Sequence, residues 1–243
     1  MPGLRLLLLD LDDTLYSTTA FAARARRAAM EAVASFPGMT VSAEALLDEL
    51  REVIAEFGAN DHAHYDRLLR RFPEAALGGH PRAALVAAGV AAYHDTKHGG
   101  MEPFPGLLDL LADLRRAGGL RIGVVTEGLE VKQFEKLHRL GVYPFLDRGM
   151  IFVSEAIGIS KPNPKLLQRA LHCTGVPAAA ALYVGDNPVN DVAPARALGM
   201  VAVRFRSPGG KHAVVEGPAA PDHEVADFAG LRTVLREAHG VAV

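Results

Sequence analysis

The sequence predicts an α/β protein whose parallel-sheet core carries a separate helical insert. Short, continuous apolar runs, the first at residues 6–9, are typical of strands that are buried on both faces. From residue 101 onward such runs alternate with helical patterns, and this alternation implies parallel strands joined by right-handed crossovers. Residues 17–100 show helical patterns only. We therefore expect a three-layer, Rossmann-like core formed by residues 1–16 and 101–243, with an all-helical insert formed by residues 17–100.

The composition is that of an ordinary globular protein. The 243 residues are 49% hydrophobic and 22% charged, and the net charge of −2 gives no reason to expect a nucleic-acid partner. No segment reaches the ~20 apolar residues of a membrane span. The apolar run near the N-terminus is broken by Asp10 and Asp12, which argues against a secretory signal. The one cysteine, Cys173, precludes an internal disulfide, so we expect a cytoplasmic protein with Cys173 in its core.

The helical insert is expected to contain four helices. Apolar residues at helical spacing predict them over 18–36, over the segment between an N-cap at Ser42 and a closing Gly58, over 63–72 and over 81–94. Gly99-Gly100 and the Pro- and Gly-rich residues 103–106 then mark the return of the chain to the core.

The core is expected to continue with strands and helices in turn. Further strands are predicted at 122–125, 151–153, 182–184 and 201–203, with a weak one at 224–225. Helices are predicted at 107–116, 129–140, 164–173, 191–198 and 231–238.

Polar residues follow these strands at the points where the strands end. Asp10 and Asp12 come directly after residues 6–9 and can face one small volume, because side chains at i and i+2 of an extended chain point the same way. Two carboxylates 4 Å apart repel each other by about 4 kcal/mol at an effective dielectric constant of 20, so a cation or a catalytic task must offset the cost. The later strands are followed by Thr126, by Lys161 and by Asp186 with Asp191, which we expect to converge on the same edge of the sheet.

Taken one at a time, these residues have simpler explanations. Thr126 on its own is typical of a strand end or a turn, and a lone lysine such as Lys161 is typical of a surface. Asp186 and Asp191 can be turn and N-cap residues. Only their order along one chain favours a shared site.

That order resembles the four motifs of the haloacid dehalogenase-like hydrolase superfamily. The matching residues are Asp10-Leu11-Asp12-Asp13-Thr14, Thr126, Lys161 within Ser-Lys-Pro, and Gly185-Asp186 with Asn190-Asp191. The helical insert is similar to the cap that this family carries after its first motif. Thr126-Glu127-Gly128 and the residues around Asp12 look most like small-metabolite phosphatases, including an N-acylneuraminate-9-phosphatase-like branch.

The resemblance implies a magnesium-dependent phosphomonoester hydrolase. Asp10 would attack phosphorus and form an aspartyl phosphate, and Asp12 would protonate the leaving alcohol and then deprotonate water. Thr126, Lys161 and backbone N–H groups near Leu11 and Glu127 would hold the phosphoryl group.

The same resemblance implies an Mg²⁺ site with oxygen ligands only. Asp10, Asp186 and the backbone carbonyl of Asp12 would bind the ion, and Asp191 would support the ligands from behind or bind through water. The expected partner is a small phosphate ester; neither its identity nor the oligomeric state follows from the sequence.

Three other functions compete with this one. A phosphotransferase or phosphomutase of the same fold would share every motif residue. A dehalogenase needs neither magnesium nor the second acid, so Asp12 and Asp186 argue against it. A non-catalytic binding protein would be expected to have lost one of these motif residues. In the cap, His62 and His64 are two residues apart and do not share a helix face, so residues 61–66 fit a loop near substrate better than a metal site, and plain solvent exposure better than either.

Overall fold

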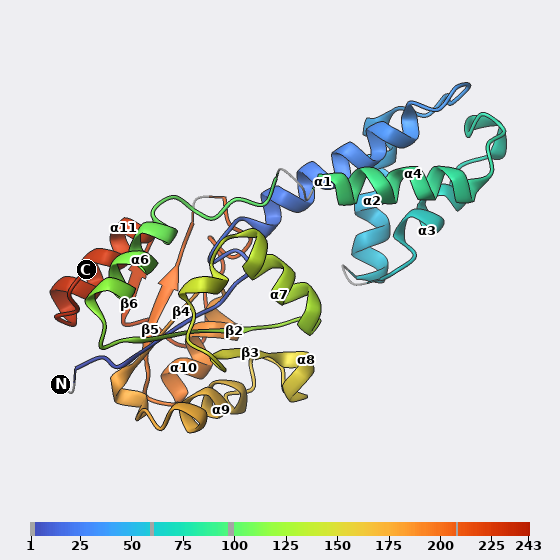
Figure 1. Cartoon of the computed structure of the whole chain (residues 1–243). Coiled ribbons are helices and arrows are strands. Elements are labelled where there is room, and N and C mark those ends of the chain that lie inside the picture. The colour runs from blue at the N-terminus through green and yellow to red at the C-terminus, as the bar shows by residue number, and fades with distance from the viewer. Residues whose placement is uncertain (1–2, 59–60, 97–99, 208) are drawn as a thin grey trace. The chain divides into compact units, whose positions relative to one another are not determined.

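The fold is described by a computed structural model that covers residues 3–58, 61–96, 100–207 and 209–243 (Figure 1). The chain forms two compact units. One unit consists of Met1–Thr19 and Met101–Val243, and we call it the core; the other consists of Ala20–Gly100, and we call it the helical unit. Gly99 of the predicted return segment lies outside the described residues.

A six-stranded parallel sheet forms the centre of the core. Its order is β3-β2-β1-β4-β5-β6. The strands are β1 (Leu6–Leu9), β2 (Arg121–Thr126), β3 (Ile151–Val153), β4 (Ala181–Gly185), β5 (Val201–Phe205) and β6 (His223–Val225). The chain builds β2 and β3 on one side of β1 and then β4 to β6 on the other. The carboxyl ends of β1 and β4 therefore lie at the switch point, where open α/β sheets bind ligands.

Helices cover both faces of this sheet (Figure 1). Helices α6 (Leu107–Ala117) and α11 (Phe228–Thr233) pack together on one face. On the other face, Leu6 and Leu8 pack with buried residues of α9 (Lys165–Thr174) and α10 (Ala193–Ala197). Helix α7 (Glu130–Arg139) follows β2, and the short α8 (Ser154–Ile157) follows β3. The predicted α/β class with a parallel, Rossmann-like sheet is confirmed.

Two predicted helices begin earlier than expected. In place of 191–198, a π-helical turn at Pro188–Val192 leads into α10, because the Asn187 side chain accepts hydrogen bonds from the N–H groups of Val189 and Asn190. In place of 231–238, α11 begins at Phe228 after an Asp227 cap and continues as a π-helical turn, Val234–Ala238. The prediction for Cys173 is wrong: its side chain is exposed on α9.

The helical unit has its own cluster of buried apolar side chains. Its helices are α1 (Thr18–Ala34), whose first two residues belong to the core, α2 (Ala43–Phe57), α3 (His64–Arg70) and α4 (Arg82–Asp95). The four predicted helices are confirmed, and Ser42 caps α2 by accepting from Ala45 N–H. Leucine, valine, alanine and methionine side chains fill the centre of the unit, among them Met30, Leu50 and Leu68. No helix in the described part of the chain is long and apolar enough to cross a bilayer.

Candidate active site

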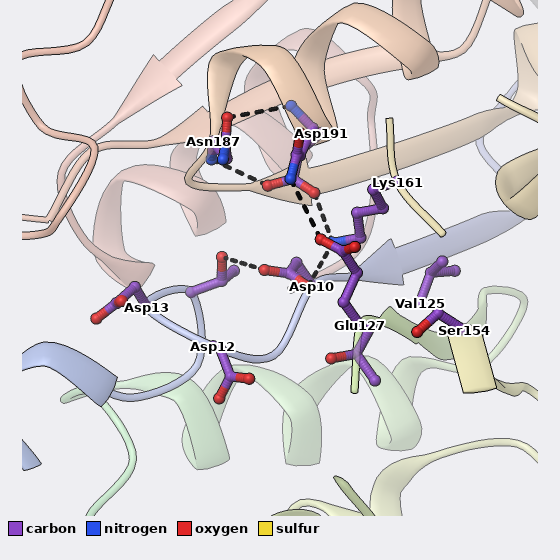
Figure 2. Close-up of polar contacts among 12 residues, drawn as sticks. Asp10, Asp12, Asp13, Val125, Glu127, Ser154, Lys161, Asn187 and Asp191 are labelled. Carbon is purple, nitrogen blue, oxygen red and sulfur yellow. Dashed lines mark hydrogen bonds and ion pairs between the residues drawn. The ribbon is translucent and has the colours of Figure 1, made fainter. Parts of the chain in front are cut away.

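The polar residues predicted to meet at the sheet edge do lie together. Asp10 directly follows β1, Thr126 ends β2 and Asp186 directly follows β4. Lys161 comes from the loop between α8 and α9, and Asp191 from the π-helical turn after β4. All five side chains are buried, Asp191 to 1% exposure. Figure 2 shows Asp10, Lys161 and Asp191 in direct contact.

Lys161 holds two carboxylates at once. Its Nζ lies 2.6 Å from Asp10 Oδ1 and 2.6 Å from Asp191 Oδ1 (Figure 2). Burial alone would lower the pKa of Lys161, but the two carboxylates raise that pKa well above its ordinary value. The ammonium group is therefore a fixed positive charge beside Asp10.

Asp191 is fixed by its surroundings on every side. Its Oδ1 also accepts from the Tyr183 hydroxyl at 3.0 Å, and its Oδ2 accepts from the Asn187 N–H at 2.9 Å. Gly185 lies so close that an added Cβ would stand 2.6 Å from Asp191 Oδ2. Only glycine leaves room for this carboxylate, and both of its oxygens already have partners.

The acidic side chains suit a hard divalent cation. Asp10, Asp186 and Asp191 each offer a carboxylate oxygen, and these oxygens lie within 4.8 Å of one another. Asp186 Oδ2 is buried and has no hydrogen-bond partner among the described residues. Burial and the neighbouring acids raise the pKa of Asp186 to about 8, and burial, opposed by Lys161, raises the pKa of Asp10 to about 7. A cation would satisfy the unpaired oxygen and the excess negative charge.

A side chain of helix α7 donates a hydrogen bond to Thr126. Gln133 Nε2 lies 2.8 Å from Thr126 Oγ1 and also donates to the Glu127 backbone carbonyl. The Glu127 side chain is tied back by the Ser160 hydroxyl and by Asn190 Nδ2, which lies 3.2 Å from Glu127 Oε2. The Thr126 hydroxyl is thereby held at the end of β2, the strand that pairs with β1.

Asp12 has its own charged partner and shares the amide nitrogen of Gln133 with Thr126, at 3.2 Å from Asp12 Oδ2. Lys136 Nζ lies 2.7 and 2.6 Å from its two carboxylate oxygens, and the Tyr16 hydroxyl donates to Oδ1 at 2.9 Å. Burial would raise the pKa of Asp12, but Lys136 and its hydrogen bonds lower it below the ordinary value. In Figure 2 the Asp12 carboxylate points away from Lys161 and Asp191.

Sequence reasoning missed several side chains of this site. Tyr183 lies inside the apolar run of β4 and gave no signal. Gln133 did give a signal. It lies four residues before Leu137 and seven before Leu140, which are both buried, so it takes a core-facing position on α7. A glutamine in such a stripe calls for a polar partner. Lys136 follows one turn later on the same helix.

Residues from the segment 61–66 help to line a pocket within the helical unit. The pocket has a volume of about 240 Å³, and its walls include Arg26, His62, His64 and Asp66. Asp61 is engaged by Arg67 at 2.7 Å, and His64 Nε2 lies 2.8 Å from the Gly58 carbonyl oxygen. These residues form no cluster of metal-ligating groups among the described residues.

Comparisons with known proteins agree with this geometry. The family model for haloacid dehalogenase-like hydrolases matches residues 4–199. A glyceraldehyde 3-phosphate phosphatase of Methanopyrus kandleri is 42% identical over 238 residues, which cover 96% of this chain and 98% of that protein. A protein of the same name from Methanocaldococcus jannaschii is 34% identical over 230 residues (95% and 96%). Among solved structures, a 2-haloacid dehalogenase from Pseudomonas syringae aligns with a TM-score of 0.62 and 27% identity over 97% of this chain and 99% of that one.

Proposed function

We propose that this chain, which belongs to the haloacid dehalogenase-like hydrolases and is a phosphoric monoester hydrolase, works with Mg²⁺ through a phosphorylated Asp10. The observation that carries the proposal is the buried group of Asp10, Lys161 and Asp186, in which the Asp10 carboxylate contacts a fixed ammonium group and lies within 4.8 Å of an acid that has an unpaired oxygen, Asp186 Oδ2. Phosphoryl transfer needs this combination of a positioned nucleophile and positive charge.

Asp10 performs the first step. Lys161 occupies Oδ1, and the Thr14 hydroxyl contacts Oδ2 only at 3.5 Å, so Oδ2 is the freer oxygen. Oδ2 forms a bond to phosphorus as the bond between phosphorus and the ester oxygen breaks. The Lys161 ammonium group and the Thr126 hydroxyl stabilise the negative charge on the phosphoryl oxygens.

Asp12 handles the protons. It donates one to the leaving alcohol, and the Asp12 carboxylate then accepts a proton from the water that attacks phosphorus, which releases phosphate and restores Asp10. The incoming phosphoryl group adds negative charge near Asp12 and opposes the effect of Lys136 on its pKa. In an in-line displacement the leaving oxygen lies opposite the nucleophile, which suits an acid that points away from the Asp10 cluster.

The metal ligands are on Asp10 and Asp186, with the backbone carbonyl of Asp12. Asp191 supports them from behind, because Lys161, Tyr183 and Asn187 already occupy its oxygens. When bound, Mg²⁺ supplies positive charge that offsets the carboxylates and the phosphoryl group.

The substrate we propose is glyceraldehyde 3-phosphate. The two relatives reported above carry that activity in their names and align over nearly the whole chain, helical unit included. A three-carbon phosphate ester also fits the expectation of a small phosphorylated metabolite.

The test measures free phosphate released from glyceraldehyde 3-phosphate by the wild type and by Asp10→Asn, with Mg²⁺ and with EDTA. We expect Mg²⁺-dependent release that falls by at least about 10³-fold in the variant, since the nucleophile is gone. Release that survives EDTA or the substitution would reject the mechanism. An isomerised ester in place of free phosphate would identify a phosphomutase.

A further inference from the structure

Two residues of α7 contact the proposed acid–base group, and the mechanism above gives them no task. Gln133 is 2% exposed although its side chain is a primary amide. Lys136 lies one turn further along the same face, and its side chain is 22% exposed. A buried amide and a half-buried ammonium are costly unless each has good partners, so their partners are informative.

The amide nitrogen of Gln133 links two parts of the site. Besides Thr126 Oγ1 at 2.8 Å, it lies 3.2 Å from Asp12 Oδ2. An amide NH₂ group can only donate, so the Thr126 oxygen accepts in this contact. The hydroxyl proton of Thr126 is then left to donate elsewhere, and no other acceptor for it is found among the described residues. Gln133 thus turns Thr126 into a donor at the end of β2.

Lys136 fixes the position of Asp12. Its ammonium group contacts both carboxylate oxygens, at 2.7 and 2.6 Å, so the carboxylate plane is held as well as its location. The hydroxyls of Tyr16 and Thr18 complete the contacts to Oδ1, at 2.9 and 3.1 Å. Every one of these groups belongs to the core.

We propose that Gln133 and Lys136 are positioning residues of the reaction. Lys136 holds Asp12 on the side of the leaving oxygen, and Gln133 directs the Thr126 hydroxyl proton toward the phosphoryl group. The inference rests on the proposed function, because it assigns these residues roles that act through Asp12 and Thr126.

The test for Lys136 compares two esters of nearly the same size. p-Nitrophenol is a far stronger acid than phenol, so p-nitrophenyl phosphate needs a general acid much less than phenyl phosphate does. We expect Lys136→Met to lower kcat/KM for phenyl phosphate about tenfold more than for p-nitrophenyl phosphate. The ratio of the two values on one preparation cancels any inactive fraction. Lys136→Arg should restore most of the ratio, and Lys132→Met, an exposed lysine of the same helix, should leave it unchanged.

Double-substitution cycles distinguish positioning from a structural role. On an Asp12→Asn background Lys136→Met should have no further effect on the ratio, and on a Thr126→Val background Gln133→Leu should cost no further kcat/KM for p-nitrophenyl phosphate. An unchanged ratio in Lys136→Met, or additive losses in both cycles, would overturn this inference. Turnover of the esters by the wild type would still support the proposed function in that case. A wild type that hydrolyses neither ester would overturn both.

Discussion

The two units of this chain each place one cation between two carboxylates. In the core, Lys161 contacts Asp10 and Asp191, both at 2.6 Å. In the helical unit, Arg71 contacts Glu49 at 2.7 Å and Glu56 at 2.6 Å. The distances match, but the Lys161 side chain is 5% exposed and the Arg71 side chain 26%. The same contact therefore has different consequences, since burial removes the water that would otherwise solvate the charges.

This contrast extends to the rest of each unit. Every buried polar or charged side chain in the described part of the chain belongs to the core, and most surround the sheet edge: Asp10, Asp13, Thr14, Thr126, Gln133, Lys161, Asp186, Asp191, Arg204 and Ser207. The helical unit buries apolar side chains and keeps its ion pairs in contact with water. Ion pairs in the helical unit are thus ordinary surface features, whereas the two buried ion pairs of Lys161 in the core come at a cost that a function must justify.

Removal of the buried cation should have the largest effect. Lys161→Met leaves Asp10 and Asp191 without their shared partner, and the loss of one member of a buried ion pair typically costs about 3–5 kcal/mol. We expect a clear drop in Tm together with a fall in kcat/KM of at least about 10²-fold, since the charge beside the phosphoryl group is lost. Thermal unfolding and phosphate release measure the two effects.

The matched control is Lys165→Met, an exposed lysine at the start of α9. It removes the same charge from a solvated position, so both Tm and activity should stay close to the wild type. Equal effects of the two substitutions would mean that the burial of Lys161 carries no special weight.

The same contrast explains which parts of the site could be predicted from the sequence. Asp10 and Asp186 were accessible because each interrupts a buried apolar run, and a polar residue at that place is conspicuous. Lys136 was not, because amphipathic helices contain lysines routinely and its significance depends on what β1 places opposite it. The core-facing position of Gln133 on α7 indicates a polar partner, but it does not say which residues of β1 and β2 that partner comes from. The early starts of the π-helical turn before α10 and of α11 were missed because the Asn187 and Asp227 caps lie upstream of the apolar pattern. Cys173 was misplaced because the face of α9 that meets the sheet is set by Leu166, Leu167 and Ala170.

A change of pH should affect the stability of the core in a metal-dependent way. The pKa values of Asp10 and Asp186, about 7 and about 8, lie above the ordinary 3.8, so the folded state binds more protons than the unfolded state between these limits. Without metal, this contribution to stability is complete below pH 3.8 and is lost as the pH rises through 7 to 8. We expect the Tm of EDTA-treated protein to fall by several degrees, on the order of 5 °C, from pH 5.5 to 8.5.

Mg²⁺ should reverse that trend, because its binding requires the deprotonated carboxylates. The rise in Tm on addition of Mg²⁺ should be larger at pH 8.5 than at pH 5.5, and Asp186→Asn should reduce it. If Mg²⁺ raised the Tm equally at both pH values, the ion would bind elsewhere than at these raised carboxyl groups.

The smallest effect is expected for the exposed cation. Arg71→Ala removes the ion pairs of Arg71 with Glu49, Glu52 and Glu56 in the helical unit. Solvent and salt already weaken such contacts, so Tm should change by less than about 3 °C and kcat/KM should not change. Leu50→Ala serves as the positive control, since a cavity at this buried position costs about 2–5 kcal/mol and shows that unfolding of the helical unit is detected. If Arg71→Ala lowered the Tm as much as Lys161→Met, the stabilisation by these ion pairs would depend on their distances and not on their burial.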